Sequence, residues 1–255
     1  MSEVRTERIL SFDSTELAVH RLGPRDGGGR PVMLVHGLFS SAEMNWIRFG
    51  HARTLAEAGF EAIMPDLRAH GASEAPHDPE AYPPGVLVQD LDLLWHALWR
   101  PGMDLVGFSL GARTVVSAVA AGVEPRRLVL AGMGLESLSN WDKRVGFFVD
   151  AIDRFDSVRQ GDPAYFAVQF MKTMKIDRVA ARLLLTNGID DRPDDLAALT
   201  MPTLVVAGDK DRDNGSPQAL AEALPNARFE EIPGTHMSSV TEPDLGEAIV
   251  RFLTA

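Results

Sequence analysis

Short apolar runs alternate with longer amphipathic stretches over most of this chain of 255 residues, and no other feature limits the fold as strongly. Runs such as PVMLVHG, FEAIMPD and MDLVGF are apolar throughout, which is typical of strands buried on both faces of a parallel sheet. Parallel strands need a crossover of about a dozen residues or more, usually a helix. The alternation therefore predicts an α/β fold with a doubly wound, mostly parallel sheet.

The sequence starts with a different pattern. Two extended stretches, 7–12 and 17–22, are separated by the turn-like pair Asp13-Ser14 and predict a β-hairpin. The first crossover is an amphipathic stretch from about Trp46 to Ala58, which predicts one helix.

The alternation stops between Leu135 and Thr200. This stretch has no strand-like run, and its segments VGFFVDAIDRF, PAYFAVQFMKTM and DRVAARLLL have apolar residues at helical spacing. Strand-like and helical segments resume with MPTLVVAGD. We therefore predict one α/β core made of residues 1–134 and 201–255, with a small helical cap, residues 135–200, inserted after the sixth strand.

Composition excludes several classes of function. The formal net charge is −11, from 25 basic and 36 acidic side chains, so a role in binding nucleic acid is not expected. The absence of cysteine excludes disulfides, cysteine-ligated zinc and a thiol nucleophile. The charged N-terminus does not resemble a signal peptide, and no apolar stretch reaches the roughly 18 residues of a membrane span. We expect a cytoplasmic protein, and the oligomeric state stays open.

The pentapeptide Gly107-Phe108-Ser109-Leu110-Gly111 matches the pattern G-x-S-x-G between a predicted strand and a predicted helix. This pattern places a serine on a very tight turn, and the flanking glycines are needed because neighbouring backbone passes close by. The free N–H groups at the start of the following helix point toward the site, where negative charge would develop. Ser109 is therefore the candidate nucleophile.

The order of several motifs extends this interpretation. His36-Gly37 follows the third strand, the segment 66–73 (DLRAHGAS) follows the fourth, and an acidic loop and a histidine follow the last two strands. With these motifs the chain resembles the α/β-hydrolase superfamily, as a serine esterase-like member with a helical cap. The resemblance implies an oxyanion hole formed by the backbone N–H groups of Leu38 and Leu110. It also implies a structural role for His36 and His70.

A serine needs a base within hydrogen-bond reach, and the family order of serine, acid and histidine selects His236. The position before this histidine is commonly glycine in relatives but is Thr235 here. That side chain could stiffen or narrow the loop without removing the base. The other histidines have no motif and are expected on the surface or on helix faces: His20, His51, His77 and His96.

The acid has three candidates in the run GDKDRD, namely Asp209, Asp211 and Asp213. Relatives have the acid at the last position of G-x-x-D, which is Asp211. Its role is to hold the histidine in the correct tautomer and to stabilise the imidazolium. A minority of relatives carry the acid after the sixth strand, where Glu136 is the alternative.

No metal or cofactor is expected. The acidic run resembles the start of an EF-hand loop, but its sixth position is Asn214 instead of glycine and its twelfth is Leu220 instead of glutamate. The sequence has neither a paired-histidine zinc spacing nor a dinucleotide or nucleoside-triphosphate loop.

The expected reaction is cleavage of a carboxylic ester, or a related acyl bond, of a small and largely apolar substrate through an acyl-enzyme on Ser109. Alternatives with the same residues are carbon–carbon bond hydrolase, thioesterase, lactonase and perhydrolase. A small-molecule-binding or receptor protein with little turnover is the alternative of another class. Epoxide hydrolases and dehalogenases of this fold carry aspartate at the elbow and are disfavoured.

An uncharged acyl group is favoured, although Arg113 could meet a substrate carboxylate. The residues expected to line the substrate pocket are Phe39, Phe108, Met133, Phe147, Phe148 and Met237.

Overall fold

The computed structural model describes residues 3–24, 28–139, 141–189 and 195–255. Eight strands among these residues form one sheet in the order β1-β2-β4-β3-β5-β6-β7-β8. The β1–β2 and β2–β4 pairs are antiparallel and the other pairs are parallel, which confirms the predicted hairpin and the mostly parallel sheet. The strands are β1 Arg5–Leu10, β2 Glu16–Leu22, β3 Arg30–Val35, β4 Phe60–Pro65, β5 Asp104–Phe108, β6 Leu128–Ala131, β7 Thr203–Gly208 and β8 Ala227–Ile232.

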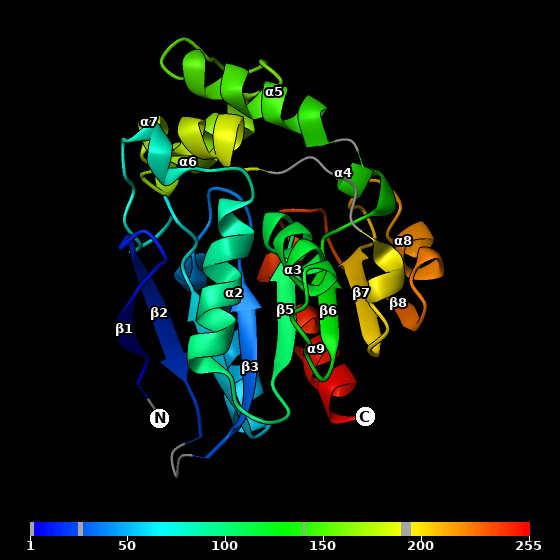
Figure 1. Ribbon diagram of the computed structural model, residues 1–255. Helices are drawn as coiled ribbons and strands as arrows, with labels where there is room; N and C mark the ends of the chain where they lie inside the picture. Colours follow the sequence, from blue (N-terminus) through cyan, green and yellow to red (C-terminus); the bar gives the residue numbers. More distant parts are fainter. Residues whose placement is uncertain (1–2, 25–27, 140, 190–194) are drawn as a thin grey trace.

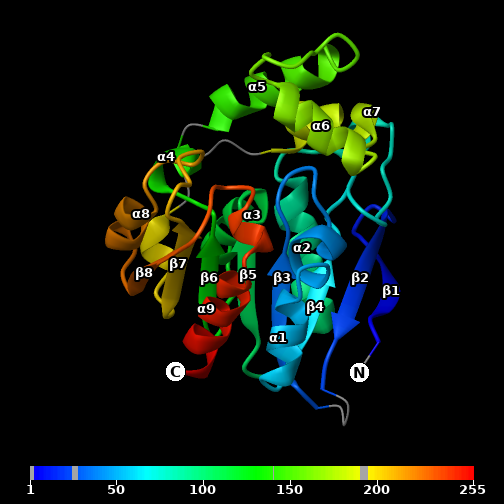
Figure 2. The same cartoon turned by 180° about the vertical axis from the view of Figure 1, so that it is seen from behind.

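Helices cover both faces of the sheet. Helices α2 and α3 lie on the face seen in Figure 1, and α1 and α9 lie on the opposite face, seen in Figure 2. One apolar core packs between the sheet and α2, α3 and α8, and a second packs between the sheet and α1 and α9. The central strand β5 is buried along its whole length, as expected for a strand covered on both faces. The bounds are α1 His51–Glu57, α2 Val86–Leu98, α3 Leu110–Ala120, α8 Pro217–Ala223 and α9 Pro243–Thr254.

The described residues between β6 and β7 contain helices and no strand. The part from 141 to 183 lies above the carboxyl edge of the sheet (Figure 1), and most of its buried apolar residues form a cluster that Phe39 of the core also joins. Residues 140 and 190–194 of the predicted insertion lie outside the described part of the chain. The helical segments are α4 Leu135–Ser139, α5 Trp141–Asp153, α6 Tyr165–Thr173, α7 Arg178–Leu183, a π-helical turn Leu184–Gly188 and a 3-10 turn Leu196–Ala198.

The single helix expected from Trp46 to Ala58 is wrong in one respect. A π-helical turn, Glu43–Ile47, and α1 are separated at Gly50, which has a φ of 88°. Apolar periodicity continues across such a break because both pieces bury the same face, so the pattern did not reveal it. Within the described residues, no helix is both long and apolar enough to cross a membrane.

Candidate active site

The candidate site lies where the parallel strands end. Strands β3, β5, β7 and β8 run in the same direction, so the loops after them meet at one edge of the sheet. These loops carry the motifs predicted from the sequence: His36-Gly37 after β3, Ser109 after β5, the acidic run after β7 and His236 after β8. The topology thus brings together residues that are far apart in the chain.

Ser109 occupies a strained turn between β5 and α3. Its backbone has φ 52° and ψ −114°, a region that residues with a side chain rarely adopt. A Cβ at Gly107 would lie 2.5 Å from the carbonyl oxygen of Gly111, and a Cβ at Gly111 would lie 2.3 Å from that of Val35. Both glycines are therefore required by close backbone approach, as the motif predicts.

Ser109, His236 and Asp211 form a continuous hydrogen-bonded chain. The Ser109 Oγ lies 3.0 Å from His236 Nε2, and His236 Nδ1 lies 2.9 Å from Asp211 Oδ2. All three residues are buried, with 7%, 7% and 5% of their surfaces exposed. Burial opposes ionisation of Asp211, but the interactions with His236, the backbone N–H of Asp213 and the charge of Arg144 together outweigh it and hold the pKa of this carboxyl below its ordinary value. The carboxylate is thus ready to stabilise a charged imidazole.

The other acid candidates make different contacts. Asp209 Oδ1 accepts a hydrogen bond of 2.8 Å from the backbone N–H of Gly234, in the loop that leads to His236. Asp213 is exposed, and its backbone N–H donates to Asp211 Oδ1 at 3.0 Å. Glu136 Oε2 accepts from the backbone N–H of Ser216. The structure therefore brings only Asp211 of these four carboxylates into hydrogen-bond contact with the His236 ring.

Asn214 also contacts His236, and sequence reasoning missed it. Its Nδ2 lies 3.3 Å from His236 Nδ1 and donates to the carbonyl oxygen of Gly132 at 2.7 Å. Its Oδ1 accepts from the Ser137 hydroxyl at 3.0 Å. In the sequence, Asn214 is notable only as a departure from an EF-hand pattern, and no local signal predicts contacts with residues about eighty positions away.

The loop after β3 is held by buried histidines. The backbone N–H of Phe39 donates to His70 Nε2 at 3.0 Å, and that of Leu67 donates to His36 Nε2 at 2.9 Å. Phe39 itself has a φ of 57°, an uncommon value for a phenylalanine. The backbone N–H groups of Leu38 and Leu110 donate to no group in the described ranges, so both remain available for a ligand.

Both loop histidines are neutral. Burial lowers the pKa of His70 to about 3, helped by the neighbouring His36, and burial also lowers the pKa of His36. Each ring accepts a backbone N–H at Nε2, so its proton is on Nδ1, which donates to the carbonyl oxygen of Gly37 for His36 and of Arg68 for His70. These contacts agree with the structural role that the resemblance implies.

One group of potential metal ligands occurs among the described residues, formed by Asp211, Asp213 and His236, with ligand atoms within 4.8 Å of one another. Two of these residues already bond each other through His236 Nδ1 and Asp211 Oδ2. An ion at this place would take the atoms that orient the imidazole, so the donor set does not fit a metal that assists Ser109.

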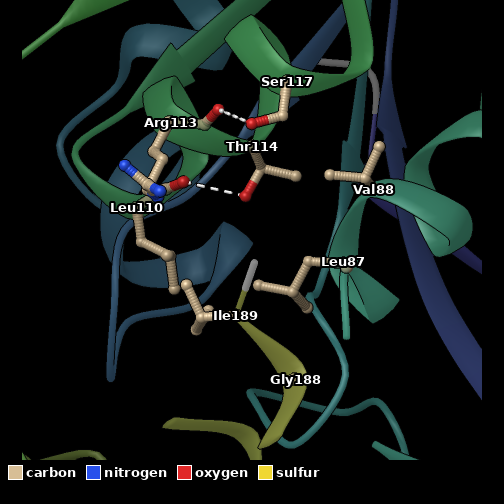
Figure 3. A pocket seen from close by; sticks show the side chains of 9 residues that line it. Leu87, Val88, Leu110, Arg113, Thr114, Ser117, Gly188 and Ile189 are labelled. Carbon is tan, nitrogen blue, oxygen red and sulfur yellow. Dashed lines mark hydrogen bonds between the residues drawn. The ribbon is translucent and has the colours of Figure 1, made fainter. Parts of the chain in front are cut away.

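The six residues expected to line the substrate pocket differ widely in exposure. Phe39, Phe108 and Met133 are buried, Phe148 is half-buried, and Phe147 and Met237 are 40% and 51% exposed. None of them lines the cavity in Figure 3, which lies between α2, α3 and the turn that ends at Gly188. That cavity has a volume of about 20 Å³, room for roughly one water molecule, so it is not an acyl site. The substrate pocket stays a prediction.

Two other side chains differ from expectation. Arg113 is buried and donates to the carbonyl oxygens of Ser137 and Leu138, so it fastens α4 to α3. His51, expected on the surface or on a helix face, lies on a buried face of α1, and its Nε2 donates to the carbonyl oxygen of Val240. This position depends on α9 covering α1, which the local pattern does not reveal.

The fold and the serine–histidine–aspartate arrangement define the class of protein, and comparison with known proteins agrees. Residues 32–248 match the alpha/beta hydrolase family, and the chain belongs to that family. Its membership and its relatives support hydrolase activity in the general sense.

Individual relatives differ in their named activities. A candidate non-heme chloroperoxidase from Synechocystis sp. is 27% identical over 238 residues, which cover 82% of this chain and 84% of the relative. An epoxide hydrolase from Caballeronia sordidicola is 40% identical over 107 residues, but the match covers only 42% of this chain and 32% of that protein. The structure of an esterase from Exiguobacterium antarcticum has a TM-score of 0.78 at 20% identity and covers 98% of this chain and all of its own. At that identity the likeness concerns the fold alone.

Proposed function

We propose that this protein is a serine hydrolase that cleaves a carboxylic ester, or a related acyl bond, of a small and largely apolar substrate. The observation that carries the proposal is the chain from Ser109 Oγ through His236 to Asp211, with contacts of 3.0 and 2.9 Å. Serine at the elbow, in place of aspartate, favours acyl transfer over the epoxide opening named for one relative.

In this mechanism the Ser109 Oγ attacks the acyl carbon while His236 Nε2 takes its proton. The negative oxygen of the tetrahedral intermediate accepts hydrogen bonds from the free N–H groups of Leu38 and Leu110. His236 then gives the proton to the leaving alkoxide, and Asp211 stabilises the imidazolium between the two transfers. Water, activated by His236, attacks the acyl-enzyme and releases the acid. The helical segment 135–200 acts as the cap that confines the substrate.

A second candidate reaction is perhydrolysis, which the relative named as a chloroperoxidase favours. Hydrogen peroxide would replace water as the nucleophile on the same acyl-enzyme, releasing a peracid and restoring Ser109. The two reactions share every step up to the acyl-enzyme. They separate in one assay, by measuring peracid formed from an ester with and without added peroxide.

The test of the proposal uses p-nitrophenyl acetate and butyrate across pH 6–9. Wild type is expected to release p-nitrophenol, and Ser109→Ala is expected to lose several orders of magnitude of kcat while remaining folded. A serine-directed phosphonate should label wild type and a Ser117→Ala control on the same helix, but not Ser109→Ala. Labelling that persists in Ser109→Ala would move the nucleophile elsewhere. No turnover of any ester by wild type would favour the small-molecule-binding class.

A further inference from the structure

The helical insertion carries a cation directly beside the candidate site. The Nη1 of Arg144, on α5, donates to the carbonyl oxygen of Asp213 at 2.5 Å, in the same loop as the acid. Asp213 and Asp211 both act on this guanidinium electrostatically. Arg144 therefore lies against the loop that carries Asp211, the carboxylate bonded to His236.

Aromatic contacts fix the other side of Arg144. Its guanidinium carbon lies 5.7 Å from the centre of the Phe148 ring and 5.8 Å from that of Trp141. The Phe148 ring in turn meets Phe39 edge-on, with centres 5.4 Å apart. Phe39 directly follows Leu38, whose free N–H is proposed to bind the oxyanion. Arg144 thus contacts the loop that carries Asp211 and, through Phe148, reaches the loop after β3 that carries Leu38 and Phe39.

The hydrogen-bonding capacity of Arg144 is mostly unused. A guanidinium offers five N–H donors, and the single hydrogen bond of Arg144 within the described ranges is the one to Asp213. Its Nε is buried without a partner, and Nη2 has none either. Nε and Nη2 form one edge of the guanidinium, with the two parallel donors that a carboxylate accepts.

Three other arginines of the insertion have carboxylate partners. Arg154 binds Asp150 and Asp162, Arg178 binds Asp156, and Arg182 binds Asp153. Burial disfavours the charged form of Arg144 and lowers its pKa, yet a guanidinium stays charged at neutral pH. A partly buried guanidinium whose Nε and Nη2 donors have no partner among the described residues is unfavourable, and Asp211 and Asp213 offset its charge without accepting from those donors.

We propose that Arg144 binds a carboxylate of the substrate, so that this hydrolase prefers esters with an anionic group near the scissile acyl bond. The inference rests on the proposed function and narrows its substrate class. It also replaces Arg113, which fastens α4, as the side chain that meets such a group. The overall charge of −11 repels anionic substrates, so a guanidinium with two donors left unpaired by the described residues gives an anionic substrate an attraction that most of the surface lacks.

The test compares matched esters. On the acyl side, mono-p-nitrophenyl adipate is compared with p-nitrophenyl hexanoate; on the leaving-group side, 4-acetoxybenzoate is compared with 4-acetoxybenzamide. In at least one pair, wild type should prefer the anionic member. Arg144→Gln should lower kcat/KM for that member roughly 10- to 100-fold and change the neutral member less than about twofold. Lys143→Gln, an exposed cation one residue away, is the matched control and should change neither.

Three results would overturn the inference. The first is an equal loss of kcat/KM for both members of a pair in Arg144→Gln, which would identify a purely structural role. The second is that Lys143→Gln has the same effect as Arg144→Gln. The third is that wild type shows no preference in either pair. Calorimetry tests binding without turnover, with adipate when the acyl-side pair shows the preference and 4-hydroxybenzoate when the leaving-group pair does. The anion should bind wild type and Ser109→Ala but not Arg144→Gln, and absence of binding to wild type also counts against the proposal. Failure of the proposed function is a separate result, because it shows as no Ser109-dependent hydrolysis of the neutral esters.

Discussion

Replacing Asp211 with asparagine should inactivate the enzyme through the tautomer of His236. The two oxygens of Asp211 have different donors: Oδ1 accepts from the backbone N–H of Asp213 at 3.0 Å, and Oδ2 accepts from His236 Nδ1 at 2.9 Å. The backbone N–H cannot change its role, so the amide oxygen of an asparagine would face it. The amide NH₂ would then face Nδ1 and force it to accept a hydrogen bond.

The expected loss of kcat follows from that orientation of the asparagine amide. With Nδ1 as acceptor, the imidazole proton moves to Nε2, which can then no longer take the proton of Ser109. The wrong tautomer at an equivalent hydrogen bond lowers kcat about 10⁴-fold in serine hydrolases. Asn214 Nδ2, which also points a donor at Nδ1 from 3.3 Å, favours the same wrong tautomer. We therefore expect a loss of about 10⁴ near neutral pH.

Asp209 and Asp213 provide matched controls in the same loop. Asp209→Asn can keep its bond from the Gly234 N–H through the amide oxygen, so we expect a loss of at most about tenfold. The side chain of Asp213 is exposed, and Asp213→Asn should stay within about threefold. The assay is kcat on p-nitrophenyl acetate at pH 7.5, with circular dichroism to check folding. A nearly wild-type Asp211→Asn beside an inactive Asp209→Asn or Asp213→Asn would refute the assignment, and activity in all three would point to Glu136.

The remaining predictions concern stability and pH. The pKa of His70 is about 3 when folded against 6.5 for a free histidine, so the unfolded state binds more protons between these values and stability falls as pH falls below 6.5. His70 alone should lower the free energy of unfolding by about 2 kcal/mol from pH 7 to pH 5, which urea unfolding can measure. In His70→Asn the free energy of unfolding should depend less steeply on pH. Ser109→Gly should be more stable than Ser109→Ala by about 1–2 kcal/mol in the same assay, because glycine adopts the φ of 52° without strain; equal stabilities would contradict a strained elbow. In Asn214→Asp, the acid limb of the profile of kcat/KM against pH should move up by about one pH unit, because a second carboxylate beside His236 favours the imidazolium. Asn214→Ala is the control and should produce no such upward shift.

Much of the fold could be predicted from the sequence because its signals are local. The strands that form the centre of the sheet are short apolar runs, and the Ser109 elbow is encoded in five consecutive residues whose glycines are needed for close backbone approach. The order of the motifs then placed the serine, aspartate and histidine candidates on loops after β5, β7 and β8, at one edge of a parallel sheet.

The unpredicted parts depend on contacts between distant segments. Arg113 and Arg144 are both arginines on helices, and nothing local tells that one binds carbonyl oxygens of α4 while the other has free donors beside the acid loop. His51 is buried because α9 packs on α1. Such assignments depend on which segments meet in three dimensions, and apolar periodicity carries no information about that choice.

The two neutral histidines join the stability of the fold to the geometry of the proposed oxyanion hole. Phe39 is held at a φ of 57° by its N–H bond to His70 Nε2, and the adjacent peptide presents the Leu38 N–H. A protonated His70 would carry a hydrogen on Nε2 and could not accept that bond. Acid should therefore loosen the loop that presents Leu38 when it destabilises the fold, separately from any titration of His236. Because the hydrogen bond from Phe39 to His70 needs a neutral ring, the burial of His70 that lowers its pKa serves the site as well as the fold.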